Sequence, residues 1–201
     1  MKILVVIGDD KIGRKAIEEI EDIEGATILL DNSTTLSRVF KLIKKKSLPL
    51  SALINMLIAN IVRPKVKNTT NHESIYSNSD LLRHLDRETV LVLFRAGLIV
   101  NSQVIGIADR VLNVHCANIP EFGGIASIYR AILAGEFEQN ATLHQVTTRI
   151  DEGDIYDTEP YQMAKENSYF KNETIAYDSG LILLKRTLSN LSEFGFDKSY
   201  L

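Results

Sequence analysis

The sequence predicts an α/β protein with a Rossmann-like, mostly parallel sheet flanked by helices, forming a single domain over residues 1–201. Two uninterrupted apolar runs, at 2–7 and 89–94, are typical of strands that are buried on both faces. Residues 12–23 carry apolar side chains at helical spacing and are followed by another apolar run at 26–30. A strand, a helix and a strand in this order indicate a βαβ unit, and therefore a parallel sheet.

The remaining elements follow from the same patterns. We expect further helices at 36–43, 50–62, 104–108, 125–135 and 175–191, a short capped helix after 78–80, and strands at 111–114, 141–146 and 155–164. Pro160 places the last of these strands at the edge of the sheet, because proline cannot donate a ladder hydrogen bond. The polar stretches at 65–75 and 167–174 are predicted to be loops and linkers.

Composition limits the possible functions. A net charge of −3 and a pI of ≈ 5.8 argue against a nucleic-acid partner, which usually requires a basic surface. The one cysteine, Cys116, excludes an internal disulfide framework and a cysteine-based zinc site, and we expect no metal. The first apolar run is too short for a signal peptide. Together these features lead us to expect a cytoplasmic protein.

The most hydrophobic stretch is 48–62, which contains Pro49, Asn55 and Asn60. Its length falls short of the roughly 20 residues that a membrane span needs, so we predict a buried or half-buried helix and no stable membrane insertion. The lysines at 41 and 44–46 precede it. They are interpreted as a solvated helix face; a contact to an anionic substrate group or to a membrane surface is the alternative.

A polar pair ends the apolar strand at 111–114. Asn113 and His115 lie two residues apart and therefore share one face of a strand. Open parallel sheets bind ligands beyond the carboxyl ends of their strands, where this pair is expected. A loop with a proline and two glycines follows, and residues 151–154 form an acidic turn in which Gly153 is expected at positive φ.

The order of motifs over 111–155 resembles the core of the folate-dependent formyltransferases. These motifs are Asn-x-His, a proline, a Gly-rich turn, a helix ending in Ala-Gly-Glu, a Thr-x-His strand and Asp-x-Gly-x-Ile. The family includes glycinamide ribonucleotide, methionyl-tRNA and sugar N-formyltransferases. The resemblance is good over about residues 90–160 and looser elsewhere, and it implies the formyltransferase fold with 10-formyltetrahydrofolate as formyl donor. It places the catalytic set on Asn113, His115 and Asp151.

The resemblance also implies that the backbone around Phe94, Arg95 and Leu98 hydrogen-bonds the pterin of the folate. His144, on the Thr-x-His strand, is interpreted as a packing or supporting residue rather than a catalytic one. Cys116 follows His115 and should face the opposite side, as a small buried residue rather than a nucleophile.

These residue types suit formyl transfer. Asn113 and a protonated His115 would donate hydrogen bonds to the oxyanion that forms when an amine attacks a formyl carbon. Asp151 would raise the pKa of His115 or accept a proton from the amine. Taken singly, each residue has an ordinary explanation: a turn cap, a core histidine and a turn carboxylate. The hypothesis therefore depends on their combination.

The expected acceptor is a small-molecule amine, either an amino sugar or a nucleotide-linked amino sugar. Glycinamide ribonucleotide is disfavoured because the first βα turn, Gly8-Asp9-Asp10, carries two carboxylates where relatives bind a phosphate. Transfer RNA is disfavoured by the acidic composition. A glycinamide ribonucleotide-type transferase, a formyltetrahydrofolate hydrolase and a non-catalytic α/β binding module remain alternatives. A homodimer is also open, since the helix at 175–191 suits either a partner or the sheet.

Overall fold

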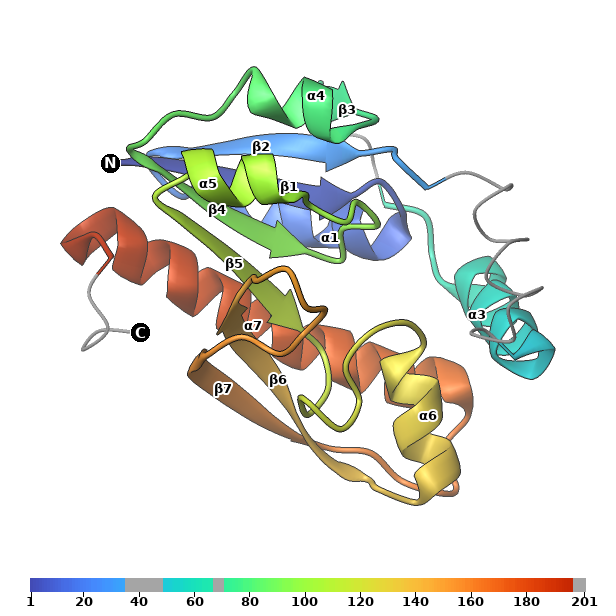
Figure 1. The fold of residues 1–201 in the computed structure, drawn as a ribbon. Coiled ribbons are helices and arrows are strands. Elements are labelled where there is room, and N and C mark those ends of the chain that lie inside the picture. Colours follow the sequence, from blue (N-terminus) through green and yellow to red (C-terminus); the bar gives the residue numbers. More distant parts are fainter. Residues whose placement is uncertain (35–48, 67–70, 197–201) are drawn as a thin grey trace.

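A seven-stranded sheet forms the centre of the computed structural model, which describes residues 1–34, 49–66 and 71–196 (Figure 1). The strand order is β3-β2-β1-β4-β5-β6-β7; the first five are parallel, and β6 pairs antiparallel with both β5 and β7. The strands are β1 (Lys2–Gly8), β2 (Ala26–Asp31), β3 (Glu73–Ile75), β4 (Thr89–Phe94), β5 (Arg110–His115), β6 (Glu138–Gln145) and β7 (Ile155–Gln162). The predicted mostly parallel α/β fold is confirmed, and β7 lies at the edge as expected.

Helices cover both faces of this sheet. Helices α1 (Lys11–Ile20) and α7 (Tyr169–Phe194) pack on one face, and α4 (Asn78–Leu82) and α5 (Ser102–Ile107) pack on the other (Figure 1). The side chains of β1 alternate between the two cores: Ile3, Val5 and Ile7 contact the α1 and α7 side, and Leu4 and Val6 the opposite side. Burial on both faces explains why β1 is apolar without interruption from Ile3 to Ile7.

Helix α7 begins earlier than the sequence indicated. Ser168 caps the helix, since its Oγ accepts the Lys171 N–H at 3.2 Å. The prediction of a linker at 167–174 is therefore wrong. Asn172 and Glu173 belong to the helix and are buried with hydrogen-bond partners. The helix packs against β5, β6 and β7. Of the two alternatives, a partner or the sheet, its apolar face therefore packs on the sheet.

The loop predicted at 65–75 contains a short strand instead. Glu73–Ile75 pairs in parallel with β2 at the sheet edge, and only Ile75 is fully buried. Three residues are too few to show an alternating pattern, and the pairing comes from backbone hydrogen bonds. The helix predicted at 36–43 and the lysines at 41 and 44–46 lie outside the described residues.

Helix α3 (Leu50–Val62) forms where the sequence predicts it and lies to one side of the sheet, near α6 (Ser127–Ala134) (Figure 1). Only one face is covered: Ala52 and Ala59 are buried, whereas Leu57 and Ile61 are 56% and 68% exposed. The prediction of a buried or half-buried helix therefore holds for that face alone. Within the described ranges, no helix has both the length and the hydrophobicity of a membrane span.

The glycine in α5 offers a simple stabilising substitution. Gly106 lies in the last turn of α5, and a Cβ built there meets no atom within 4 Å. Gly106→Ala is expected to raise the free energy of unfolding by about 0.5–1 kcal/mol, because alanine loses less backbone entropy in a helix. Urea denaturation measures the change. Gly13→Ala is the contrasting variant and should destabilise, since its Cβ would lie 1.8 Å from the Gly8 carbonyl oxygen; a loss of stability at Gly106 would contradict this account.

Candidate active site

The three residues expected to be catalytic meet at the carboxyl end of β5. Asn113 and His115 come from β5, and Asp151 comes from the turn that follows β6. Asn113 Nδ2 lies 3.4 Å from Asp151 Oδ1, and His115 Nδ1 lies 3.4 Å from Asp151 Oδ2. The side chains of His115 and Asp151 are 11% and 12% exposed. The structure thus brings together groups that are 38 positions apart, in a mostly desolvated place.

His144 completes this cluster, although its position in the sequence suggested only packing or support. Antiparallel pairing of β5 and β6 sets His144 directly opposite Asn113. Its Nε2 lies 3.0 Å from Asn113 Nδ2 and 3.3 Å from Asp151 Oδ1, and its Nδ1 lies 3.0 Å from the Gln145 carbonyl oxygen. His144 Nδ1 thus faces the Gln145 carbonyl, and Nε2 lies within reach of both the Asn113 amide and the Asp151 carboxylate. Asn113 and His144 therefore both lie beside Asp151 Oδ1.

The turn that presents Asp151 has an unusual backbone. Asp151 itself adopts the left-handed conformation, with φ at 52°, and Gly153 does not, so the prediction for Gly153 is wrong. Asp is among the residues that tolerate this conformation, through local hydrogen bonds. Gly153 is required for a different reason: a Cβ there would lie 1.8 Å from the Gln145 carbonyl oxygen. The Gly124 N–H donates to Asp151 Oδ2 at 2.6 Å and joins the Gly-rich loop to the acidic turn.

Burial and hydrogen bonding act in opposite directions on the two ionisable partners. Burial alone would raise the pKa of Asp151, but hydrogen bonding to His144, the nearby His115 and the Gly124 N–H together lower it to about 2. Burial lowers the pKa of His115, and Asp151 offsets only part of this effect. His115 is therefore neutral near pH 7, contrary to the expected imidazolium. Its Nε2–H donates to the Phe122 carbonyl at 3.0 Å, which leaves the Nδ1 lone pair beside Asp151.

Removing the Asp151 charge should shift the His115 titration. Asp151 favours the imidazolium, so Asp151→Asn is expected to lower the pKa of His115 further below its ordinary value. An NMR titration of the imidazole ring protons measures this shift directly. Glu152→Gln is the control, because that side chain is 49% exposed and pairs with Arg149. A pKa of His115 that rises in Asp151→Asn would refute the assigned electrostatics.

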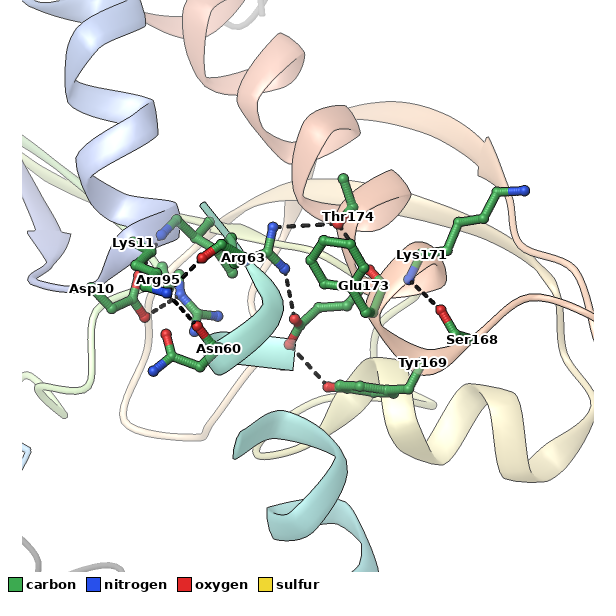
Figure 2. A network of polar contacts seen from close by, with 12 residues as sticks. Asp10, Lys11, Asn60, Arg63, Arg95, Ser168, Tyr169, Lys171, Glu173 and Thr174 are labelled. Carbon is green, nitrogen blue, oxygen red and sulfur yellow. Dashed lines mark hydrogen bonds and ion pairs between the residues drawn. The ribbon is translucent and has the colours of Figure 1, made fainter. Parts of the chain in front are cut away.

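The residues expected to bind the folate mostly make contacts inside the protein. The Phe94 side chain is buried in the core, and the Leu98 N–H donates to Asp31 Oδ2 at 2.7 Å. The Arg95 side chain is held by Asp10 and Tyr177. Its Nε lies 2.6 Å from Asp10 Oδ2, and its guanidinium stacks over the Tyr177 ring at 4.5 Å (Figure 2 shows the Arg95–Asp10 pair). That the backbone of this segment binds the folate therefore stays a prediction.

A pocket of about 440 Å³ opens beside the cluster. Asp151 contributes to its wall, with Ile119, Pro120, Glu152, Gly153 and Ile155. The pocket gives a small ligand access to the Asp151 carboxylate. Cys116, next to His115 in sequence, is 6% exposed, and burial raises the pKa of its thiol to about 12. It is the small buried residue that the sequence predicted.

Open α/β sheets bind ligands beyond the carboxyl ends of their strands, and the Asn113–His115–Asp151 cluster lies at such a position, at the end of β5. A family comparison specifies the class. The model of the formyl transferase family matches residues 16–173, and the chain belongs to this family.

Curated relatives are methionyl-tRNA formyltransferases. That of Sulfurihydrogenibium sp. is 24% identical over 129 residues, covering 63% of this chain and 42% of the relative. That of Chromobacterium violaceum is 35% identical over 89 residues, covering 44% of this chain and 29% of the relative. The chain thus aligns with less than half the length of these two proteins.

Solved structures share the fold across nearly the whole chain. An N-formyltransferase from Helicobacter canadensis, in complex with folinic acid and dTDP-3-aminofucose, has a TM-score of 0.65 at 15% identity, covering 98% of this chain and 66% of that one. A phosphoribosylglycinamide formyltransferase from Bacillus halodurans has a TM-score of 0.63 at 17% identity, covering 97% of each chain. At such identities the likeness establishes the fold.

Proposed function

We propose that this protein is an N-formyltransferase that moves the formyl group of 10-formyltetrahydrofolate to the amine of a small acceptor, an amino sugar or a nucleotide-linked amino sugar. The observation that carries the proposal is the convergence of Asn113, His115 and Asp151 beside a pocket, in the order of the family to which the chain belongs. The ligands named for the Helicobacter canadensis structure support both the donor and the acceptor class.

The reaction needs a proton acceptor and an oxyanion donor. The acceptor amine attacks the formyl carbon, its proton leaves as the new C–N bond forms, and the folate nitrogen takes up a proton as its own C–N bond breaks. Neutral His115 presents a lone pair on Nδ1 beside the ionised Asp151, so this pair can receive the proton of the amine. The Asn113 N–H that reaches Asp151 over a long 3.4 Å is the one available to the formyl oxygen.

The donor would lie against the segment from Phe94 to Leu98. Its side chains are engaged elsewhere, so we assign the pterin contacts to the backbone there. The Leu98 N–H, now bonded to Asp31, would exchange that partner for the ligand. The pocket next to Asp151 would receive the formyl group beside that carboxylate.

The first βα turn supports a sugar acceptor over glycinamide ribonucleotide. Helix N-termini commonly bind phosphate, but here Asp10 fills that position: its Oδ1 accepts the Ile12 and Gly13 N–H groups at 3.0 and 2.9 Å. Asp9 adds a second carboxylate, paired with Arg14 at 2.7 Å. A phosphate bound at this turn would have to compete with Asp10 for these N–H groups. We also propose the cytoplasmic location expected from the sequence, which the buried, unpaired Cys116 supports.

Tetrahydrofolate release from 10-formyltetrahydrofolate tests the proposal. The protein is incubated with amino sugars, nucleotide-linked amino sugars, glycinamide ribonucleotide or no acceptor. Release that depends on an amino sugar supports the proposed class. If only glycinamide ribonucleotide supports release, it replaces the amino sugar as the assigned acceptor. Release without any acceptor would indicate a hydrolase. The absence of both turnover and folate binding, the latter measured by calorimetry, would exclude the proposed reaction.

A further inference from the structure

Helix α3 is mostly apolar, with Ser51, Asn55 and Asn60 as its polar residues. Its 13 residues contain no charged side chain. The outward face carries six large apolar side chains that are 49–68% exposed: Leu50, Ile54, Leu57, Ile58, Ile61 and Val62. Their spacing along the chain places them on one helical stripe. An exposed apolar stripe of this size marks an interaction surface, so we expect it to have a partner.

The inward face and the end of α3 are fixed to the body of the protein. The Tyr129 hydroxyl donates to Ser51 Oγ at 2.7 Å. At the other end, Lys11 Nζ donates to the Asn60 and Arg63 carbonyl oxygens at 2.6 and 2.5 Å, and Arg63 pairs with Glu173 at 2.8 Å (Figure 2). The helix therefore presents its outward stripe in a fixed orientation, which lowers the entropic cost of binding.

The stripe has the pattern of a helix–helix seam. Leu50, Ile54, Leu57 and Ile61 follow one another at intervals of four, three and four residues. This is the d-a-d-a order of a heptad, with leucine at d and isoleucine at a, the combination that favours two-stranded packing. We propose that α3 packs against α3 of a second copy of this chain, in an isologous dimer centred near Leu57.

The available area suits such a dimer. The six side chains expose roughly 600 Å² in each copy, at the upper end of what monomers leave uncovered. Complete burial in two copies would remove at most roughly 1,200 Å² from solvent, the lower limit of a specific interface. A membrane-surface helix, in contrast, carries lysine and arginine on the face opposite its apolar stripe. The opposite face of α3 holds Ala52 and Ala59 against the protein, which favours a protein partner.

Sedimentation equilibrium between about 1 and 100 µM tests the dimer. Wild-type protein is expected to dimerise, and Leu57→Glu should weaken the association at least tenfold, or 1.4 kcal/mol. Leu133→Glu is the matched control, because Leu133 is 67% exposed on α6 and lies outside the stripe. Circular dichroism and thermal melting establish that both variants fold. Wild-type protein that stays monomeric over the whole range, or dissociation by Leu133→Glu alone, would overturn the proposal.

A cross-linking measurement keeps the proposal testable if Leu57→Glu fails to fold. Leu57→Cys introduces no charge at an exposed position, and the native thiol at Cys116 is buried. Under mild oxidation Leu57→Cys should give a disulfide-linked dimer, whereas Leu133→Cys should not. Wild-type monomers that bind vesicles of anionic phospholipid through α3, with no cross-link at position 57, would replace the dimer by a membrane contact.

Discussion

Asp151→Asn is expected to reduce formyl transfer by about 10²–10⁴-fold, the range that a positioned general base contributes. The asparagine keeps the size of the side chain and removes the negative charge beside His115 Nδ1, 3.4 Å away. The proton of the attacking amine then lacks its ionic acceptor, so kcat should fall much more than KM rises. Tetrahydrofolate release with a saturating amino-sugar acceptor measures both constants.

Two further variants make this result specific. His115→Ala should lose activity to a similar degree, and the double variant should lose little more than either single one, since the two residues act as a unit. Asp109→Asn, on an exposed loop residue, is the control that keeps activity. Full activity in Asp151→Asn would remove Asp151 from the mechanism, whatever the outcome at His115.

Glu173→Gln is expected to lower the free energy of unfolding by about 3–5 kcal/mol, because it leaves the Arg63 charge buried without its ionic partner. Arg63 Nη2 and Glu173 Oε2 lie 2.8 Å apart, and their side chains are only 10% and 5% exposed (Figure 2). Glu173 also accepts the Tyr169 hydroxyl at 3.1 Å. Urea denaturation followed by circular dichroism gives the free energy.

An exposed ion pair provides the comparison. Glu19 and Lys185 lie 2.9 Å apart, but their side chains are 44% and 45% exposed, so Glu19→Gln should cost less than about 1 kcal/mol. Replacing Arg63 and Glu173 together by methionine should restore part of the lost stability, because no charge is then buried. Equal losses from Glu173→Gln and Glu19→Gln would show that burial adds nothing to the Arg63 pair.

Most of the sheet was predictable because parallel strands are buried on both faces. The runs at 2–7 and 89–94 have no other straightforward interpretation, and they became β1 and β4. Elements that depend on partners were harder to predict. Glu73–Ile75 is a strand because β2 pairs with it, and the start of α7 is helical although the buried Asn172 and Glu173 there are polar. The burial of such polar residues can be predicted only when their hydrogen-bond partners are known.

The same distinction applies to the site. Asn113 and His115 could be placed together because strand alternation is a local property. The role of His144 depends on the register between β5 and β6, which no periodicity reports. The net pKa shift of His115 depends on burial by distant segments, and so does the inward turn of Arg95 towards Asp10 and Tyr177. Motif order identified the cluster, and tertiary packing determined its electrostatics.

The cluster joins two parts of the molecule that differ in how readily they open. Asn113 and His144 are paired across adjacent strands inside the sheet, where local opening requires nearly global unfolding. Asp151 lies in a left-handed turn outside the strands, held mainly by the Gly124 N–H and its two histidine neighbours. On warming, the turn should detach while the sheet persists. Catalytic activity would then disappear reversibly at a lower temperature than secondary structure, so heat inactivation and unfolding would be separate events.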